Sequence, residues 1–155
     1  MGTWGNGGGR WLLVQFPLVA LAAILARVGP KLPESGARAA RPLGLGAIAT
    51  GMAFFVAGVA SQGRSLTPLP RPRDGATLVR TGPYRVVRNP IYLGGVLASL
   101  GNTLWHGHPL GLVGTVLLAI FFDAKSTNEE RWLTQKFPEY PAYRASTGKL
   151  IPGVF

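Results

Sequence analysis

The feature that most constrains this chain is its longest uncharged run, which covers residues 89–122. As one helix the run would measure about 51 Å, which exceeds the hydrocarbon core of a bilayer, about 30 Å thick. The run must therefore fold back on itself. The break falls at residues 106–109, where Gly107 and Pro109 interrupt the helical pattern. We predict a tight helical hairpin whose first arm is Pro90–Trp105 and whose second arm begins at Pro109.

Each arm is short for a full span, so we expect either tilted helices or extension of the second arm past the membrane. No helix breaker occurs between Thr115 and Phe137. Two more apolar runs precede the hairpin, Trp11–Val28 and Leu43–Ser61, with the connection Gly29–Pro42 between them. Only 14% of the residues are charged and 47% are hydrophobic, whereas a soluble domain carries about 25% charged residues. We therefore predict an all-α polytopic membrane protein with four transmembrane helices. A cleavable signal peptide is the alternative interpretation of the first run.

The second apolar run carries small side chains that recur along the helix: Gly44, Ala47, Gly51 and Gly58. Small residues let the backbone of another helix approach closely. We expect them to pack against another helix of the same chain; they would also permit pairing between copies but do not imply it. The absence of cysteine excludes disulfides, thiolate metal sites and cysteine nucleophiles.

The basic residues lie mainly in the connections between apolar runs, where a membrane protein meets anionic headgroups. Lys and Arg number 16 against 6 Asp and Glu, a net charge of +10. With four spans, Arg10, the basic residues of 64–88 and those after residue 122 share one side and outnumber those on the other. The positive-inside rule then places both termini in the cytoplasm. We predict an inner-membrane protein, bacterial by its Arg-, Ala- and Gly-rich composition, whose partners are lipids and not nucleic acid.

Two polar stretches flank the hairpin, and chemistry is expected in them. The first begins with residues 62–88, where prolines at 68, 70 and 72 predict an extended strap along the membrane surface. Gly82 and Pro83 then signal a turn.

The same stretch ends in a predicted helix start, with Asn89 as N-cap and Pro90 in the first helical position. Such a start presents free backbone N–H groups and the positive end of the helix dipole to an anion. Tyr84 and Tyr92 bracket it with aromatic faces that can stack on a purine or sit over a cationic sulfur. An ordinary basic and aromatic belt at the interface is the alternative.

The second polar stretch follows the hairpin and contains Lys125 and Glu129. Four residues apart, they lie on one helical face, with Leu133 one turn further on. A solvated Lys–Glu pair is the simpler interpretation of this stretch alone.

Taken together, the segments GPYRVVRNPIYLGG, the apolar hairpin, NEERWL and FPEYPAYRASTGKLIP resemble the isoprenylcysteine carboxyl methyltransferase and phospholipid N-methyltransferase superfamily. The resemblance implies an integral-membrane methyltransferase that binds S-adenosylmethionine in its C-terminal half. It also implies a lipid-like or small hydrophobic methyl acceptor and no metal. We expect one integrated domain, with two N-terminal helices in residues 1–63 and the hairpin and cytoplasmic cofactor pocket in residues 64–155.

The resemblance also implies roles for individual residues. The catalytic positions of the family fall on Lys125 and Glu129, and Glu129 also contacts the cofactor. The remaining cofactor-binding positions fall on Ala76, Thr77, Leu78, Val79, Tyr84, Asn89, Pro90, Ile91 and Tyr92.

Three departures from the family pattern bear on the substrate. Asn89 replaces a common His, which removes a titratable ring. Lys125 replaces an Arg, which removes a bidentate grip on a carboxylate. The Arg that usually follows the Tyr-x-x-Tyr element is also absent from Ser146–Lys149. Amine or other lipid-like acceptors therefore rank at least as high as a prenylcysteine carboxylate.

Two hypotheses from other classes remain open. Some membrane reductases resemble the same C-terminal architecture and use NADPH, whose 2′-phosphate would require a cluster of arginines. A non-catalytic membrane protein that keeps the fold is the other, and Asn89 favours it. His106 and His108 lie in the turn between the hairpin arms, where an interfacial role is expected and not metal binding.

Overall fold

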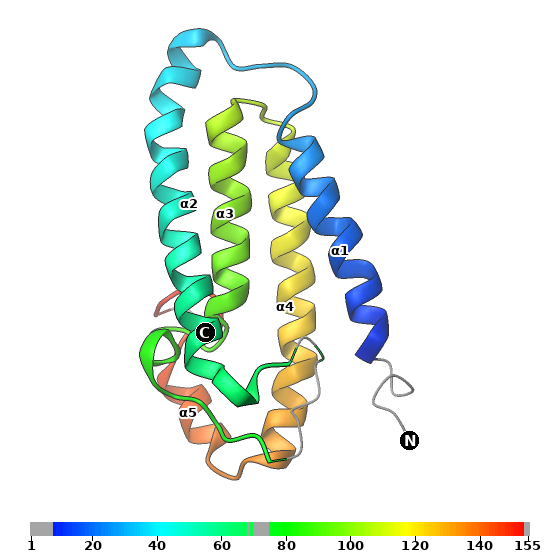
Figure 1. The fold of residues 1–155 in the computed structure, drawn as a ribbon, viewed down its shortest axis with the longest axis vertical. Helices are drawn as coiled ribbons and strands as arrows, with labels where there is room; N and C mark the ends of the chain where they lie inside the picture. The colour runs from blue at the N-terminus through cyan, green and yellow to red at the C-terminus, as the bar shows by residue number, and fades with distance from the viewer. Residues whose placement is uncertain (1–7, 68, 70–74, 154–155) are drawn as a thin grey trace.

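A computed structural model describes residues 8–67, 69 and 75–153 of the chain, and within them the regular elements are helical (Figure 1). The predicted all-helical fold is therefore confirmed. In chain order the elements are α1 (Gly8–Leu25), α2 (Glu34–Gln62), η2 (Gly63–Ser65), η3 (Gly82–Arg85), α3 (Pro90–His106), α4 (Gly111–Lys136) and α5 (Tyr140–Ser146).

The four long helices run side by side, and α5 lies at one end of the bundle, below α2 and α3 (Figure 1). α2 packs chiefly on α3, and α1 packs chiefly on α4. The start of α1, the end of α2, the start of α3 and the end of α4 all lie at the end that holds α5. This arrangement gathers the two polar stretches of the sequence at one end of the molecule.

The hairpin has the form that its sequence predicts. α3 ends at His106, and Gly107 adopts a left-handed conformation (φ 71°), with its N–H donating to the carbonyl of Thr103 at 3.0 Å. This is the usual way for glycine to close a helix. α4 begins at Gly111 and continues without a break to Lys136. The extension of the second arm beyond its apolar part is therefore confirmed.

The second helix begins earlier than its apolar run. α2 starts at Glu34, so the predicted connection Gly29–Pro42 is wrong in its second half. Glu34 suits the positive end of the helix dipole, and the alanines that follow are strong helix formers. Pro42 removes one backbone hydrogen bond, but it lies on an exposed side of the helix where solvent can replace the bond.

A glycine seam, defined here as Gly44, Gly51, Gly94 and Gly101, joins α2 to α3. A Cβ on Gly51 would lie 2.7 Å from the carbonyl oxygen of Gly94, and a Cβ on Gly101 would lie 2.5 Å from that of Gly44. Both distances are too short for a real side chain. The small residues predicted for packing therefore bring two backbones of the same chain into direct contact.

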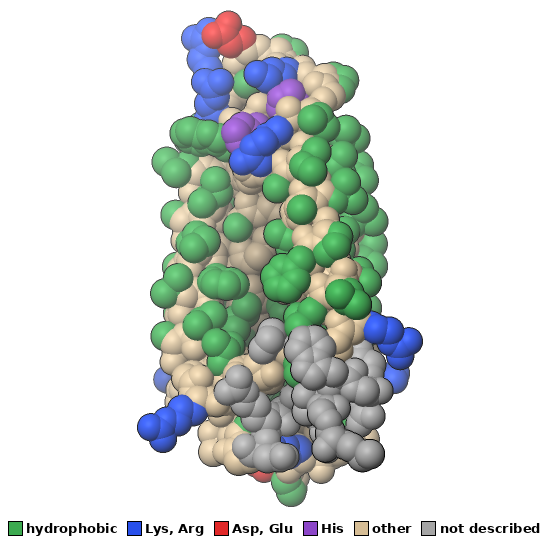
Figure 2. Space-filling view, turned by 45° about the vertical axis from the view of Figure 1, so that its right-hand side comes forward, with side chains coloured by type: hydrophobic (Ala, Val, Ile, Leu, Met, Phe, Trp, Pro, Cys, Tyr) green, Lys and Arg blue, Asp and Glu red, His purple; other side chains and the backbone are tan. Residues whose placement is uncertain are grey.

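The outer surface of the bundle is apolar between two charged ends, as the face in Figure 2 shows. Each long helix exposes large apolar side chains, including Leu13, Leu43, Trp105 and Ile120. Among the described residues one helix, Glu34–Ser65, is long and apolar enough by composition to cross a membrane, with a mean hydropathy of 1.9.

Candidate active site

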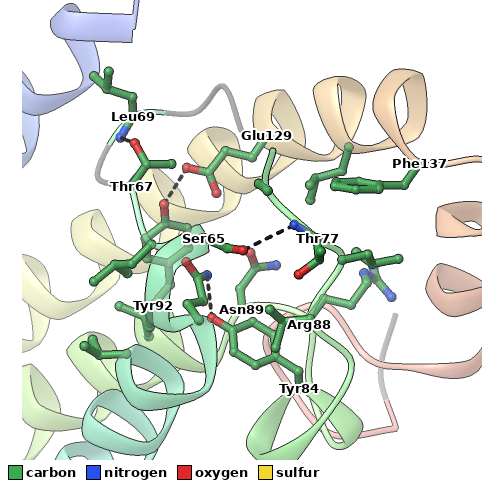
Figure 3. Close-up of a pocket in the computed structure, with 18 of the residues that line it drawn as sticks. Ser65, Thr67, Leu69, Thr77, Tyr84, Arg88, Asn89, Tyr92, Glu129 and Phe137 are labelled. Carbon is green, nitrogen blue, oxygen red and sulfur yellow. Dashed lines mark hydrogen bonds between the residues drawn. The ribbon is translucent and has the colours of Figure 1, made fainter. Parts of the chain in front are cut away.

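A cavity of about 340 Å³ lies at the end of the bundle that holds α5 (Figure 3). All the long helices contribute to its wall, together with the segments between α2 and α3. Most of the residues predicted from the sequence line it: Ala76, Thr77, Leu78, Val79, Tyr84, Asn89, Ile91, Tyr92, Lys125 and Glu129. Pro90 is the exception, because its fully buried ring faces Gly58 of α2.

The start of α3 and the far end of α4 meet inside this cavity. The hydroxyl of Tyr92 donates to Oε1 of Glu129 at 2.6 Å (Figure 3). The Tyr92 ring is stacked on Phe122, with centroids 4.6 Å apart and planes 7° from parallel. The start of α3 is therefore held against α4 by a short hydrogen bond and a ring stack.

Glu129 is half-buried and faces the cavity. Burial raises the pKa of its carboxyl from 4.5 to about 7, although the hydrogen bond from Tyr92 and the charge of Lys125 oppose this rise. Loss of hydration disfavours the charged form of an acid, and the contacts restore only part of the loss. A cationic ligand group would remove the penalty, so this carboxyl is prepared to receive one.

Lys125 is almost fully buried, with 1% of its surface exposed. Its ammonium donates to Oε1 of Gln15 on α1 at 2.7 Å and lies 5.2 Å from the centroid of the Tyr92 ring. The spacing of Lys125 and Glu129 predicts that they share a helical face, but it does not predict the contact with Gln15. The signal was present, since Gln15 is a polar amide within an otherwise apolar run.

Tyr84 forms the opposite part of the wall. It is 5% exposed, and its hydroxyl accepts a hydrogen bond from Nε2 of Gln62 at 2.6 Å. Its carbonyl accepts from the hydroxyl of Tyr143 at 2.6 Å. Burial raises the pKa of Tyr84 above its usual value. The ring therefore stays neutral and presents an apolar face together with one hydroxyl to the cavity.

The segment Ala76–Val79 lines the cavity and is tied to η2. The N–H of Thr77 donates to Oγ of Ser65 at 3.3 Å (Figure 3). The predicted extended strap depends on prolines 68, 70 and 72, and these lie outside the described residues.

Asn89 occupies the N-cap position of α3, but its side chain does not cap the helix. Its carbonyl accepts the first helical hydrogen bonds, from the N–H groups of Tyr92 and Leu93. The side-chain amide instead donates to the carbonyl of Lys149 at 3.2 Å. The predicted capping by this side chain is therefore wrong, because the C-terminal segment offers the amide a carbonyl of its own.

A buried ion pair next to the cavity was not foreseen. Nε of Arg88 lies 2.9 Å from Oε1 of Glu130, and the two side chains are 4% and 6% exposed. Arg88 also donates to the carbonyls of Arg144 and Thr147. We name these four residues the C-terminal clasp. Within the acidic pair, Glu129 therefore faces the cavity whereas Glu130 anchors the end of the chain.

The two histidines lie at the opposite end of the bundle from the cavity. Nδ1 of His108 lies 3.0 Å from the carbonyl of Gly29, so this ring ties the hairpin turn to the connection after α1. Across the described part of the chain, no group of three or more His, Asp or Glu side chains is arranged to hold a metal ion.

Parts of this chain are similar to known proteins. Over 81 residues the chain is 31% identical to the cobalt-zinc-cadmium resistance protein CzcN of Cupriavidus metallidurans, and 27% identical to the nickel-cobalt-cadmium resistance protein NccN of Alcaligenes xylosoxydans xylosoxydans. Each match covers 52% of this chain but only 38% of the relative. Residues 40–140, which include α3, α4 and most of the cavity wall, match the family described as phospholipid methyltransferase. Because this match spans more than half of the chain, the protein belongs to the phospholipid methyltransferase family.

Proposed function

We propose that this protein transfers a methyl group from S-adenosylmethionine to a lipid-like or small hydrophobic acceptor. The observation that supports the proposal is the contact of 2.6 Å between Tyr92 and Glu129 inside a cavity that Ala76–Val79 borders. The cavity thus contains the three segments to which the family resemblance assigns the cofactor: Ala76–Val79, the start of α3 and the end of α4.

The residues of the cavity suit such a cofactor in size and chemistry. Small-molecule sites usually measure about 300–1,000 Å³, and this cavity measures about 340 Å³. Glu129 would hold the cofactor's amino or hydroxyl groups, since a carboxylate accepts hydrogen bonds from both. Leu78, Val79 and the ring of Tyr84 would enclose the adenine, and the start of α3 at Asn89 would face the carboxylate of the methionine part.

When bound, S-adenosylmethionine would supply an electrophilic methyl group: the acceptor's lone pair would bond to the methyl carbon as the C–S bond breaks, and S-adenosylhomocysteine would leave, without a metal. The protein's tasks are then to orient the two reactants and to exclude water. The stacked rings of Tyr92 and Phe122 provide a rigid apolar wall for this purpose. Lys125 would position the acceptor or stabilise negative charge on it.

We assign the acceptor side of the cavity to its apolar lining residues, which include Phe55 and Val59 from α2 and Leu133 from α4. Phe55 both lines the cavity and is 41% exposed. An acceptor with an acyl or prenyl tail would therefore reach the cavity sideways from the bilayer, while the cofactor would enter from the cytoplasm.

The proposal includes four membrane spans, with the apolar part of α4 ending at Phe122 and the cavity end of the bundle in the cytoplasm. The exposed apolar side chains on all four long helices support it, and the face drawn in Figure 2 is apolar between its two ends. So does the excess of basic residues at the end that holds the cavity.

This orientation predicts a labelling pattern, which the cysteine-free sequence makes simple to measure. Ser35→Cys places a thiol in the first turn of α2, and Thr81→Cys places one at the cavity end; both positions are exposed. In intact cells a membrane-impermeant maleimide should label only the first variant, and permeabilisation should expose the second. The reverse pattern would invert the proposed orientation, and labelling of both in intact cells would reject the spanning arrangement.

Titration of the purified protein in lipid nanodiscs with S-adenosylmethionine, S-adenosylhomocysteine and NADPH tests the function directly. Calorimetry should detect the first two ligands and not NADPH. Among the described residues that line the cavity, Arg88 is the one arginine, and Glu130 already pairs with it. A 2′-phosphate therefore has no cluster of arginines in this part of the wall. Binding of NADPH alone would favour a reductase, and binding of none of the three would favour a non-catalytic protein.

Cofactor affinity should also depend on pH. The pKa of Glu129 is about 7 in the free protein, so below pH 7 the carboxyl is mostly neutral and must lose a proton to receive an ammonium group. Affinity should therefore rise about fivefold between pH 6 and pH 7, and level off as the ligand's amino group deprotonates near pH 8. The matched variant Glu129→Gln should show no rise over this range, and an equal rise in both proteins would assign the dependence to another group.

A further inference from the structure

The helix α1 completes the cavity although it lies outside the family match. That match begins at residue 40, whereas α1 ends at Leu25. Gln15 of α1 nevertheless lines the cavity, and it is the one residue between Trp11 and Leu25 that carries an amide or a charge. The family-matched part of the chain therefore does not account for the whole wall.

The position of Gln15 is fixed by the packing of α1 on α4. Residues 11, 15, 18 and 22 recur at the spacing of one helical face. At one end of this face the rings of Trp11 and Phe121 lie 5.6 Å apart. At the other end Ala22 contacts Gly114 so closely that a Cβ on that glycine would lie 2.6 Å from the Cα of Ala22. Gln15 lies between these two contacts, so its amide is directed at α4.

We infer that Gln15 is a positioning residue: its amide oxygen holds the ammonium of Lys125 against the acceptor side of the cavity. The contact is the hydrogen bond of 2.7 Å between Oε1 of Gln15 and Nζ of Lys125. This inference rests on the proposed function, and it assigns to α1 a part in handling the acceptor rather than the cofactor.

A neutral partner for Lys125 has a specific advantage here. Among the described residues, the titratable groups that face Lys125 include Glu129, one turn further along α4, and Tyr92 on α3. The charged group of α1, Arg10, is exposed at the start of that helix. Full pairing of Lys125 with Glu129 would neutralise the carboxylate assigned to the cofactor. Gln15 can hold the ammonium without competing for that charge, and Tyr92 supplies the hydrogen bond to Glu129.

The test measures the ionisation of Lys125 and requires no cofactor. The full chain in lipid nanodiscs is acylated with trace acetic anhydride at several pH values, and mass spectrometry follows acylation at Lys125. Gln15→Glu places a carboxylate beside the ammonium and should raise the midpoint of the pH profile by about one to three units. Gln15→Leu removes the acceptor atom and should lower it by about one unit. The matched control Phe16→Leu, on the exposed side of α1, should leave it unchanged.

A purely structural role for Gln15 would not move the two midpoints in opposite directions. Coincident midpoints, or a shift of the same sign in both variants, would overturn the inference. A second measurement uses methyl transfer from tritiated S-adenosylmethionine into the nanodisc lipids. Gln15→Leu should lower kcat at least about fivefold with cofactor affinity unchanged, and an equal loss of cofactor affinity would also overturn the inference. If the unsubstituted chain binds no S-adenosylmethionine, the proposed function fails, whereas the acylation profiles still decide the role of Gln15.

Discussion

Replacing Glu129 with alanine is expected to weaken binding of S-adenosylmethionine by about 100-fold or more. The carboxylate lies where the start of α3 meets the end of α4, and Tyr92 donates to it at 2.6 Å. Loss of a charged hydrogen-bond acceptor from a partly buried site costs about 1.5–3 kcal/mol for each bond to a ligand. Calorimetry on the purified protein measures the change directly.

The matched control for this variant is Glu139→Ala. Glu139 is exposed and does not line the cavity, so its removal should leave the affinity within twofold. Tyr92→Phe keeps the ring stacked on Phe122 but removes the hydroxyl, and it should cause a smaller loss than Glu129→Ala. Unchanged binding by Glu129→Ala would reject the role assigned to this residue.

Replacing Arg88 with leucine is expected to destabilise the fold by about 3–5 kcal/mol, because it leaves the carboxylate of Glu130 buried without its main partner. The side chains of this pair are only 4% and 6% exposed. The variant also loses the hydrogen bonds to the carbonyls of Arg144 and Thr147, so the C-terminal clasp opens. Thermal unfolding in detergent should show a clear decrease in Tm.

Two further variants make this result specific. Arg38→Leu removes a cation from the exposed pair with Glu34, whose side chains are 70% and 81% exposed, and should change Tm little because surface pairs contribute little. The double variant Arg88→Leu with Glu130→Leu removes both buried charges and should recover part of the loss. A decrease for Arg88→Leu no larger than that for Arg38→Leu would show that the buried pair is not a major source of stability.

The parts of this protein that could be predicted from sequence are those governed by local patterns. The uncharged run and the break at Gly107 determined the hairpin, and the absence of helix breakers determined the length of α4. The spacing of Lys125 and Glu129 placed both on one face, which the structure directs into the cavity. Helical periodicity and turn chemistry act over a few residues, so a single sequence reveals them.

The contacts that were missed join distant segments. Gln15 and Lys125 are far apart along the chain, and only the packing of α1 on α4 brings them together. Arg88 binds main-chain carbonyls of Arg144 and Thr147, and every residue type has such a carbonyl. No side-chain pattern could therefore reveal the clasp. The contact of the Asn89 side chain could not be predicted for the same reason, because its amide binds a main-chain carbonyl, that of Lys149, from a distant segment.

The glycine seam between α2 and α3 limits how copies of this chain can associate. Its four glycines are consumed in a contact within one molecule, where the carbonyl of one helix occupies the space that a methyl group would need on the other. These four glycines are therefore not available to a second copy. An oligomer of this protein would have to use residues on the outside of the bundle, where apolar side chains such as Leu43 and Val56 are exposed.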